Sequence, residues 1–161
     1  MIANPWIAAL FALFLWWFST GAILWVVRRA DNQSAGLKND GGHVMTALLA
    51  SPVFFAGVVA LLASLPDARP GGAWIGYVAA HKLWGWIELA YLPGLIAGPI
   101  RTPCPEDATG WDRFRRAWGT IAYHELLLVT ALLAIWLLSY EAANQITLLT
   151  FAVLFVARVS A

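Results

Sequence analysis

Apolar stretches about as long as a membrane-spanning helix recur along the whole chain, and only short polar connections separate them. A helix that crosses the hydrocarbon core of a bilayer needs roughly 20 consecutive apolar residues. With 161 residues, 61% hydrophobic and only 12% charged, the chain has room for about five such helices and for no separate soluble domain. We therefore predict an all-α, polytopic integral membrane helix bundle that forms a single transmembrane domain over residues 1–161. The predicted spans are 5–27, 43–65, 73–98, 118–138 and 145–159.

Composition also disfavours several classes of function. The single cysteine, Cys104, excludes an internal disulfide and a metal site built from several thiolates. The net charge of +1, without a basic stripe outside the loop ends, argues against a nucleic-acid partner. No segment matches a zinc-protease helix, a nucleophile elbow or a phosphate-binding loop, so we expect a protein that is not an enzyme. The first apolar stretch has no basic segment before it and is expected to be a retained helix, not a cleaved signal peptide.

Lysine and arginine are distributed unevenly between the two sides of the predicted bundle. With five spans, only Arg69 falls on one side, and Lys82 lies within the third span. The basic residues on the other side are Arg28, Arg29, Lys38, Arg101, Arg113, Arg115, Arg116 and Arg158. Because cytoplasmic loops are enriched in Lys and Arg, the N-terminus is predicted to be periplasmic and the C-terminus cytoplasmic. The loop arginines expected to contact lipid phosphates or the cytoplasmic face of a partner are Arg101, Arg113, Arg115 and Arg116.

Four of the ten tryptophans lie in the middle of a predicted span and not near its ends. They are Trp16, Trp17, Trp84 and Trp86. Indoles usually prefer the membrane interface, where their N–H group stays hydrated. These four are therefore expected to pack against another helix of the bundle, a partner protein, a pigment or a lipid tail.

Ionisable side chains within the third and fourth spans are the candidate site. His81, Trp84, Glu88 and Tyr91 are spaced three, four and three residues apart, so they form one stripe on a helix. His124 and Glu125 lie at nearly the same predicted depth in the fourth span as Glu88 in the third. If the two helices are antiparallel neighbours, Glu88 meets His124 or Glu125 inside the membrane.

Three interpretations of these residues stay open. The first is a structural polar pair that fixes the register of two helices. The second is a magnesium tetrapyrrole site that uses His124 or His81, and the third is a proton relay or acid–base pair. One histidine with one or two carboxylates is too few for a specific metal signature, so no metal site is predicted.

Short signatures spread over nearly the whole chain resemble the photosynthetic complex assembly protein 2 family (PuhE type). The matching segments are LWWFSTGAIL (15–24), WGWIELAYLPGLIAGP (84–99), RTPCP (101–105), GW (110–111), YHE (123–125), NQ (144–145) and TFAVLFVARVSA (150–161). Members of this family are polytopic membrane proteins encoded with photosynthesis genes in purple bacteria and their relatives. The family continues beyond the position of Ala161, so this sequence is expected to be a shortened relative or to lack the remainder.

The resemblance implies a role in assembly or stabilisation of the photosynthetic reaction centre and its light-harvesting 1 antenna. It places the protein in the inner, intracytoplasmic membrane of a phototrophic bacterium, with reaction-centre and light-harvesting 1 subunits and membrane lipids as partners. The chain is then either a transient assembly factor or an accessory transmembrane subunit. The alternative is a bacteriochlorophyll-handling protein or enzyme that uses His81, Glu88, His124 and Glu125. No cofactor is assigned, and contact with bacteriochlorophyll, carotenoid or lipid stays open.

Overall fold

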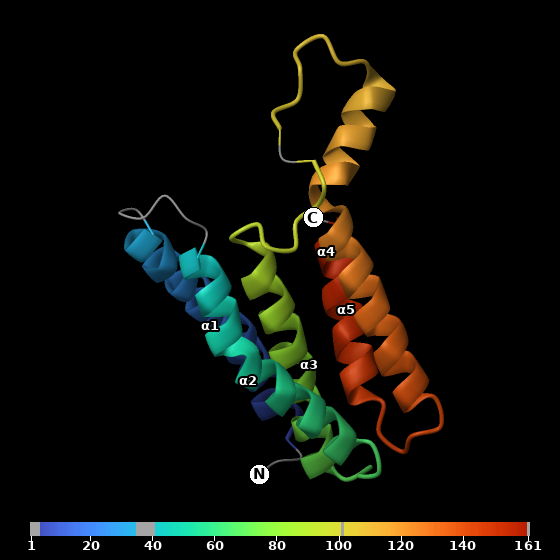
Figure 1. Ribbon diagram of the computed structural model, residues 1–161. Helices are drawn as coiled ribbons and strands as arrows, with labels where there is room; N and C mark the ends of the chain where they lie inside the picture. Colours follow the sequence, from blue (N-terminus) through green and yellow to red (C-terminus); the bar gives the residue numbers. More distant parts are fainter. Residues whose placement is uncertain (1–3, 35–40, 101, 161) are drawn as a thin grey trace.

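The computed structural model describes residues 4–34, 41–100 and 102–160. All regular secondary structure in these residues is helical, which confirms the predicted all-α class. The helices are α1 (Pro5–Ser34), α2 (Gly41–Ser64), α3 (Pro70–Tyr91), α4 (Gly110–Ser139) and α5 (Ile146–Ser160). Figure 1 shows α3 in the centre, with α1 and α2 on one side and α4 and α5 on the other. Helices α3 and α5 run in the same direction, and α4 runs antiparallel to both.

The central helix is also the most buried one, and small residues make its close packing possible. Ala79 and Ala80 are fully buried, and Gly76 lies against Thr147 of α5. Small side chains let helix backbones approach closely, which is the usual basis of packing between membrane helices. The apolar core around them consists of Leu61, Ala79, Ala80, Leu83, Ile87, Leu128, Ile135 and Phe151.

Three of the five helices are long and apolar enough to cross a membrane. These segments are Trp6–Arg29, Val44–Ser64 and Gly110–Ser139. α5 is apolar but has only 15 residues, and α3 carries His81, Lys82 and Glu88. The chain is therefore a helical bundle with the composition of a membrane protein. Its division into five spans and its orientation remain predictions.

Three helix boundaries differ from the predicted ones by more than three residues. α1 continues to Ser34, although residues 30–34 were expected in a loop, because extending a helix costs less than starting one. α3 ends at Tyr91 and not near 98, since Pro93 offers no N–H group and Gly94 takes a φ of 81°. α4 begins at Gly110, eight residues earlier than predicted, with Asp112 in its positively polarised first turn.

One end of the bundle is fastened by Asn144, in the connection between α4 and α5. Its backbone N–H donates to the Leu65 carbonyl at 3.1 Å, and its side-chain amide donates to the Asp67 carbonyl at 3.1 Å. Its side-chain oxygen accepts the Ile146 N–H at 3.0 Å. One turn later, the Thr147 hydroxyl donates to the Gly76 carbonyl at 3.0 Å. We call these contacts the Asn144 junction; it ties the α2–α3 turn to the start of α5.

Candidate functional site

Four ionisable side chains from three helices converge at the opposite end of α3. His124 Nε2 of α4 lies 3.5 Å from Glu88 Oε1 of α3, and His124 Nδ1 lies 3.6 Å from Glu125 Oε1. Arg158 of α5 approaches the same Glu88 oxygen, with its Nε at 3.8 Å. We call Glu88, His124, Glu125 and Arg158 the Glu88–His124 cluster. The structure thus brings together three of the residues expected at the site.

The polar atoms of this cluster are close to one another but not hydrogen-bonded. Distances of 3.5 to 3.8 Å exceed the 2.7–3.2 Å typical of N–H···O bonds. Among the described residues, the buried side-chain atoms without a hydrogen-bond partner are Glu88 Oε1, His124 Nδ1 and Nε2, and Ser139 Oγ. Three of these four atoms belong to the cluster. With a second proton on His124, the cluster carries no net charge, because two carboxylates then face two cations.

The Tyr91 ring covers one face of the His124 side chain. The Tyr91 ring stacks on the His124 imidazole, with 4.0 Å between centroids and 29° between planes. The Arg158 guanidinium lies over the same Tyr91 ring, 5.4 Å from its centroid. His124 is consequently 0% exposed, while the Glu88 and Arg158 side chains are 17% and 34% exposed. Any molecule that approaches this cluster therefore meets the carboxylates of Glu88 and Glu125 or the Arg158 side chain, and not the imidazole.

The backbone at His124 is fixed by the segment that follows α3. The Ala97 carbonyl accepts the N–H groups of Tyr123 at 3.0 Å and His124 at 3.2 Å. Ile100 N–H donates to the Gly119 carbonyl at 3.1 Å. A Cβ added to Gly98 would clash with the Gly119 carbonyl oxygen, so only glycine allows this approach. α4 changes direction in its first half (Figure 1), and the docked segment holds the α4 backbone at Tyr123 and His124.

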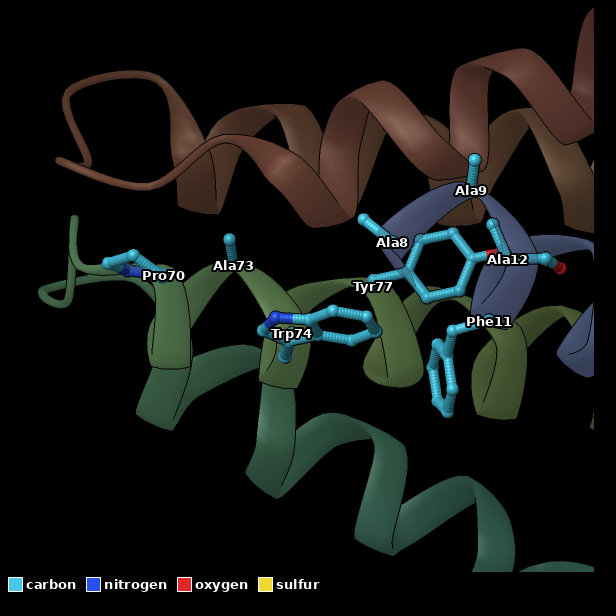
Figure 2. Close-up of a pocket in the computed structure, with 8 residues that line it drawn as sticks. All are labelled: Ala8, Ala9, Phe11, Ala12, Pro70, Ala73, Trp74 and Tyr77. Atoms are coloured by element: carbon cyan, nitrogen blue, oxygen red, sulfur yellow. The ribbon is translucent and has the colours of Figure 1, made fainter. Parts of the chain in front are cut away.

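His81 lies apart from the cluster, although it shares the predicted stripe with Glu88. His81 Nδ1 is 3.0 Å from the Tyr77 carbonyl, and its ring packs on the Tyr77 ring at 4.4 Å. The Tyr77 hydroxyl donates in turn to the Ala12 carbonyl of α1 at 3.1 Å. Figure 2 shows Tyr77 reaching toward Ala12 beside the edge-to-face pair of Phe11 and Trp74. The stripe therefore separates into His81, which packs on Tyr77 within α3, and the remaining three residues, which contact α4 or α5.

The four mid-span tryptophans fall into two pairs. Trp84 packs edge-to-face on Phe151 of α5, with centroids 5.2 Å apart. Trp86 donates from Nε1 to the Ala47 carbonyl of α2 at 3.2 Å. Trp16 and Trp17 on α1 are instead 59% and 73% exposed. The α3 pair is used in packing within the bundle, whereas both members of the α1 pair are largely exposed and Trp16 borders the cavities between α1 and α5.

The arginines predicted at the cytoplasmic surface make short-range contacts. Arg115 and Arg116 pair with the same carboxylate, that of Asp112, at 3.0 and 2.8 Å. Arg113 donates to the Glu106 carbonyl at 3.1 Å. Arg101 lies outside the described residues. These three arginines were expected in a loop but lie in the first two turns of α4, where Asp112 balances one of their charges.

Comparison with known proteins gives the family of the chain. Residues 2–161 match the family described as "Protein of unknown function (DUF3623)". The chain belongs to the DUF3623 family. It is also 43% identical over 158 residues to the "Uncharacterized 30.4 kDa protein in puhA 5'region" of Rhodobacter capsulatus. That match covers 98% of this chain and 56% of the relative, so the DUF3623 chain spans little more than half of that protein. No solved structure matches.

Sequence reasoning assigned no site role to two parts of this DUF3623 site. Arg158 was used only to predict orientation, although it is a cation near the end of α5 that reaches Glu88. The docking of Ala97 on α4 was not foreseen either, because the segment 92–98 was expected to be helical. The usable signal was the Pro93-Gly94 pair, which marks a helix end more strongly than a kink. Among the described residues, no group of three or more His, Cys, Asp or Glu side chains is arranged to hold a metal ion.

Proposed function

We propose that this chain is a non-catalytic integral membrane protein that assists assembly or stabilisation of the bacterial reaction centre–light-harvesting 1 complex. The observation that carries the proposal is the similarity to the protein in the puhA 5′ region of Rhodobacter capsulatus. It agrees with the resemblance of segments 84–99, 101–105 and 150–161 to a family encoded with photosynthesis genes. Both lines support a photosynthesis-related role in a bacterial membrane.

The geometry of the Glu88–His124 cluster supports a binding role over a catalytic one. A general base must reach the proton that it abstracts, within about 3 Å or through one water. His124 is 0% exposed and covered by Tyr91, so its nitrogens offer no such access. The Glu88, Glu125 and Arg158 side chains stay partly exposed, so the cluster is instead suited to contacting a partner or ligand.

The outer face of α1 is the surface that we assign to the partner. It presents Trp17 and Trp25 as exposed indoles, together with Phe14 and Phe18. Large aromatic side chains dominate the energetics of helix and protein contacts, because they bury much area with little conformational entropy lost. Helices of the reaction centre or the antenna are the proposed occupants of this face.

The test is a native separation of photosynthetic membranes in mild detergent, followed by mass spectrometry of the reaction-centre band. The protein carries its natural sequence with a terminal tag and is expressed from its own locus. We expect the chain in that band, in near-equal amount if it is an accessory subunit and in smaller amount if it is an assembly factor. Migration only as a free protein, with no photosynthetic subunit attached even after chemical crosslinking, contradicts the proposal.

A matched pair of variants then separates the α1 face from the rest of the bundle. Trp17→Ala removes an exposed indole, whereas Leu137→Ala removes a large exposed side chain from α4. We expect the first substitution to lower co-migration with the reaction centre and the second to leave it unchanged. Equal losses in both variants would assign the effect to general destabilisation.

Pigment handling is the second candidate, and the placement of His81 favours it. His81 lines the cavities between α1 and α5, and with Nδ1 bonded to the Tyr77 carbonyl its Nε2 is the nitrogen left to act as a ligand. Of the two intramembrane histidines it is therefore the better candidate for a magnesium ligand. The corresponding test is the pigment content of the purified protein, which should fall in His81→Ala and stay unchanged in His124→Ala.

A further inference from the structure

The first part of α4, residues 110–119, carries an aromatic face, and we call this part the α4 arm. Trp111, Phe114 and Trp118 are spaced three and four residues apart, so they lie on one face of the helix. They are 75%, 56% and 55% exposed, and the Trp111 and Phe114 rings stack with 5.3 Å between centroids. Within the described residues, the bundle thus leaves most of this aromatic face uncovered.

A bend in the first half of α4 separates the arm from the rest of the helix (Figure 1). In that half, the Ala97 carbonyl accepts the Tyr123 and His124 N–H groups, and the Gly119 carbonyl accepts the Ile100 N–H. These bonds compete with the helix's own bonds between residues four apart, and a group that inserts into that ladder is a common cause of a bend. The docked segment therefore gives the arm its own direction.

The length of α4 places this bend at the edge of a bilayer. α4 is among the helices long and apolar enough to cross a membrane, and its residues 120–139 span roughly 30 Å, which equals the hydrocarbon thickness. In a straight helix, Trp111 would stand roughly 14 Å beyond that core. The head-group layer is only roughly 5–8 Å deep on each side, so the aromatic face would extend into water. A bent helix can instead keep the arm beside the interface, where indoles are enriched.

Arginines accompany the aromatic face. The arm contains three arginines and one acidic residue, Asp112, whose carboxylate is shared by Arg115 and Arg116 at 3.0 and 2.8 Å. Arg113 donates to the Glu106 carbonyl, which carries no net charge. Arg115 is 71% exposed and lies four residues after Trp111, at the edge of the aromatic face. Aromatic residues on one face with arginines beside them are typical of helices that lie in a lipid interface.

We propose that the α4 arm lies in the membrane interface, with its aromatic face among the lipid head groups and Arg115 at a lipid phosphate. The interface buries the rings and keeps the indole N–H groups hydrated, and a guanidinium matches the geometry of phosphate oxygens. The arm then fixes the depth of α4, so that His124 lies roughly 6 Å inside the hydrocarbon. This inference concerns lipid and does not depend on the function proposed above.

The test is the depth of single nitroxide labels on the purified full chain, in nanodiscs of phosphatidylcholine and phosphatidylglycerol. Cys104→Ser removes the native thiol, and each protein carries one label, at Trp111→Cys, Phe114→Cys or Arg113→Cys. Labels on the aromatic face should collide often with oxygen, which dissolves in lipid, and rarely with a water-soluble nickel chelate. Collision with nickel should be several-fold more frequent at position 113, on the other side of the arm. Equally frequent nickel collisions at all three positions would overturn the proposal, because the arm would then stand in water.

Variants of the arm provide the matched control. Replacing both indoles, by Trp111→Gln with Trp118→Gln, should raise nickel collisions of a label at Phe114→Cys toward the value at position 113. Thr120→Ala, on the side of α4 away from the aromatic face, should leave them unchanged. If the double variant does not fold, Trp111→Gln alone, at the exposed start of α4, serves the same purpose. An unchanged label in the folded indole variant would also contradict the proposal.

The two proposals fail separately. A chain that co-migrates with the reaction centre while its arm stays accessible to nickel in nanodiscs would refute this inference alone. An arm that lies in the interface, in a chain that never co-migrates with photosynthetic subunits, would refute only the proposed function.

Discussion

The two ends of α3 are each joined to their neighbours by polar side chains, but in opposite ways. At one end, the Asn144 junction consists of hydrogen bonds between 3.0 and 3.1 Å, and its side chains have partners for their donors and acceptors. At the other end, the Glu88–His124 cluster has contacts of 3.5 to 3.8 Å and three buried atoms without a hydrogen bond. Helices α3 and α5 contribute to both ends, the α2–α3 turn takes part only in the first, and α4 supplies two side chains to the second.

This difference indicates which end serves stability and which end is available for function. A buried polar group with its hydrogen bonds made adds stability and fixes one arrangement, whereas an unsatisfied one is costly to keep. The Asn144 junction is therefore expected to hold the fold. The Glu88–His124 cluster retains charge that stability alone does not explain, so it is the end where we expect a partner or ligand to act.

The largest loss of stability is expected from a change at Gly98, in the segment that docks on α4 next to His124. Gly98→Ala places a methyl group against the Gly119 carbonyl and separates the Ala97 segment from α4. Overpacking of this kind typically costs about 1–3 kcal/mol, and we expect the upper part of that range because the opposing atoms are backbone. The free energy of unfolding, measured by denaturant titration in micelles, tests this value. Gly21→Ala, with nothing within 4 Å of the added methyl group, should leave it unchanged or raise it.

The next largest effect is expected at the Asn144 junction. Asn144→Ala removes the hydrogen bonds to the Asp67 carbonyl and from the Ile146 N–H, and it leaves both backbone groups of these half-buried residues without those partners. A loss of about 2 kcal/mol in the free energy of unfolding should follow, at roughly 1 kcal/mol for each bond. The neighbouring exposed Gln145 is the control, and Gln145→Ala should cost much less. Similar losses in the two variants would mean that the junction does not fasten the bundle.

A smaller change in stability, with a larger change in function, is expected from Glu88→Gln. This substitution keeps the shape of the side chain and removes its charge, and Glu88 makes no side-chain hydrogen bond that would be lost. The free energy of unfolding should therefore change by less than about 1 kcal/mol. The amount of reaction centre–light-harvesting 1 complex in membranes should nevertheless fall. A stability loss equal to that of Asn144→Ala, with normal complex levels, would remove the distinction between the two ends.

The all-α architecture was predictable from the sequence, because long apolar stretches in this composition leave few alternatives to helices. The approach of Glu88 to His124 followed from their similar depths in neighbouring helices. The Asn144 junction did not follow, since it joins residues 77 positions apart through loop backbone that no periodicity describes. The role of Arg158 was also hidden, because a basic residue near a helix end is explained equally well by membrane topology.

The smallest effect is expected from a fall in pH, which acts on the Asp67–Arg69 pair beside the Asn144 junction. The Arg69 side chain donates to the Asp67 carboxylate at 2.8 and 3.1 Å, and these bonds, with one from the Arg69 backbone, lower the Asp67 pKa below its ordinary value of 3.8. A carboxyl group with a lowered pKa in the folded state stabilises that state above its ordinary pKa. The contribution is then lost as the pH falls through the folded-state value.

The pair is exposed to solvent, so this contribution is small, but it acts on a turn whose Asp67 carbonyl accepts the Asn144 amide. We expect hydrogen exchange at the α2–α3 turn to quicken, relative to the intrinsic rate, as the pH falls below about 4, near the ordinary pKa of an aspartate. In Asp67→Asn this dependence should disappear, because the amide does not titrate. Under the same conditions exchange at the core residues of α3 should keep its protection, since the remaining Asn144 and Thr147 bonds involve no ionisable group. Equal acceleration of exchange at both ends of α3 would contradict this prediction, because the effect of pH would then not originate in the α2–α3 turn.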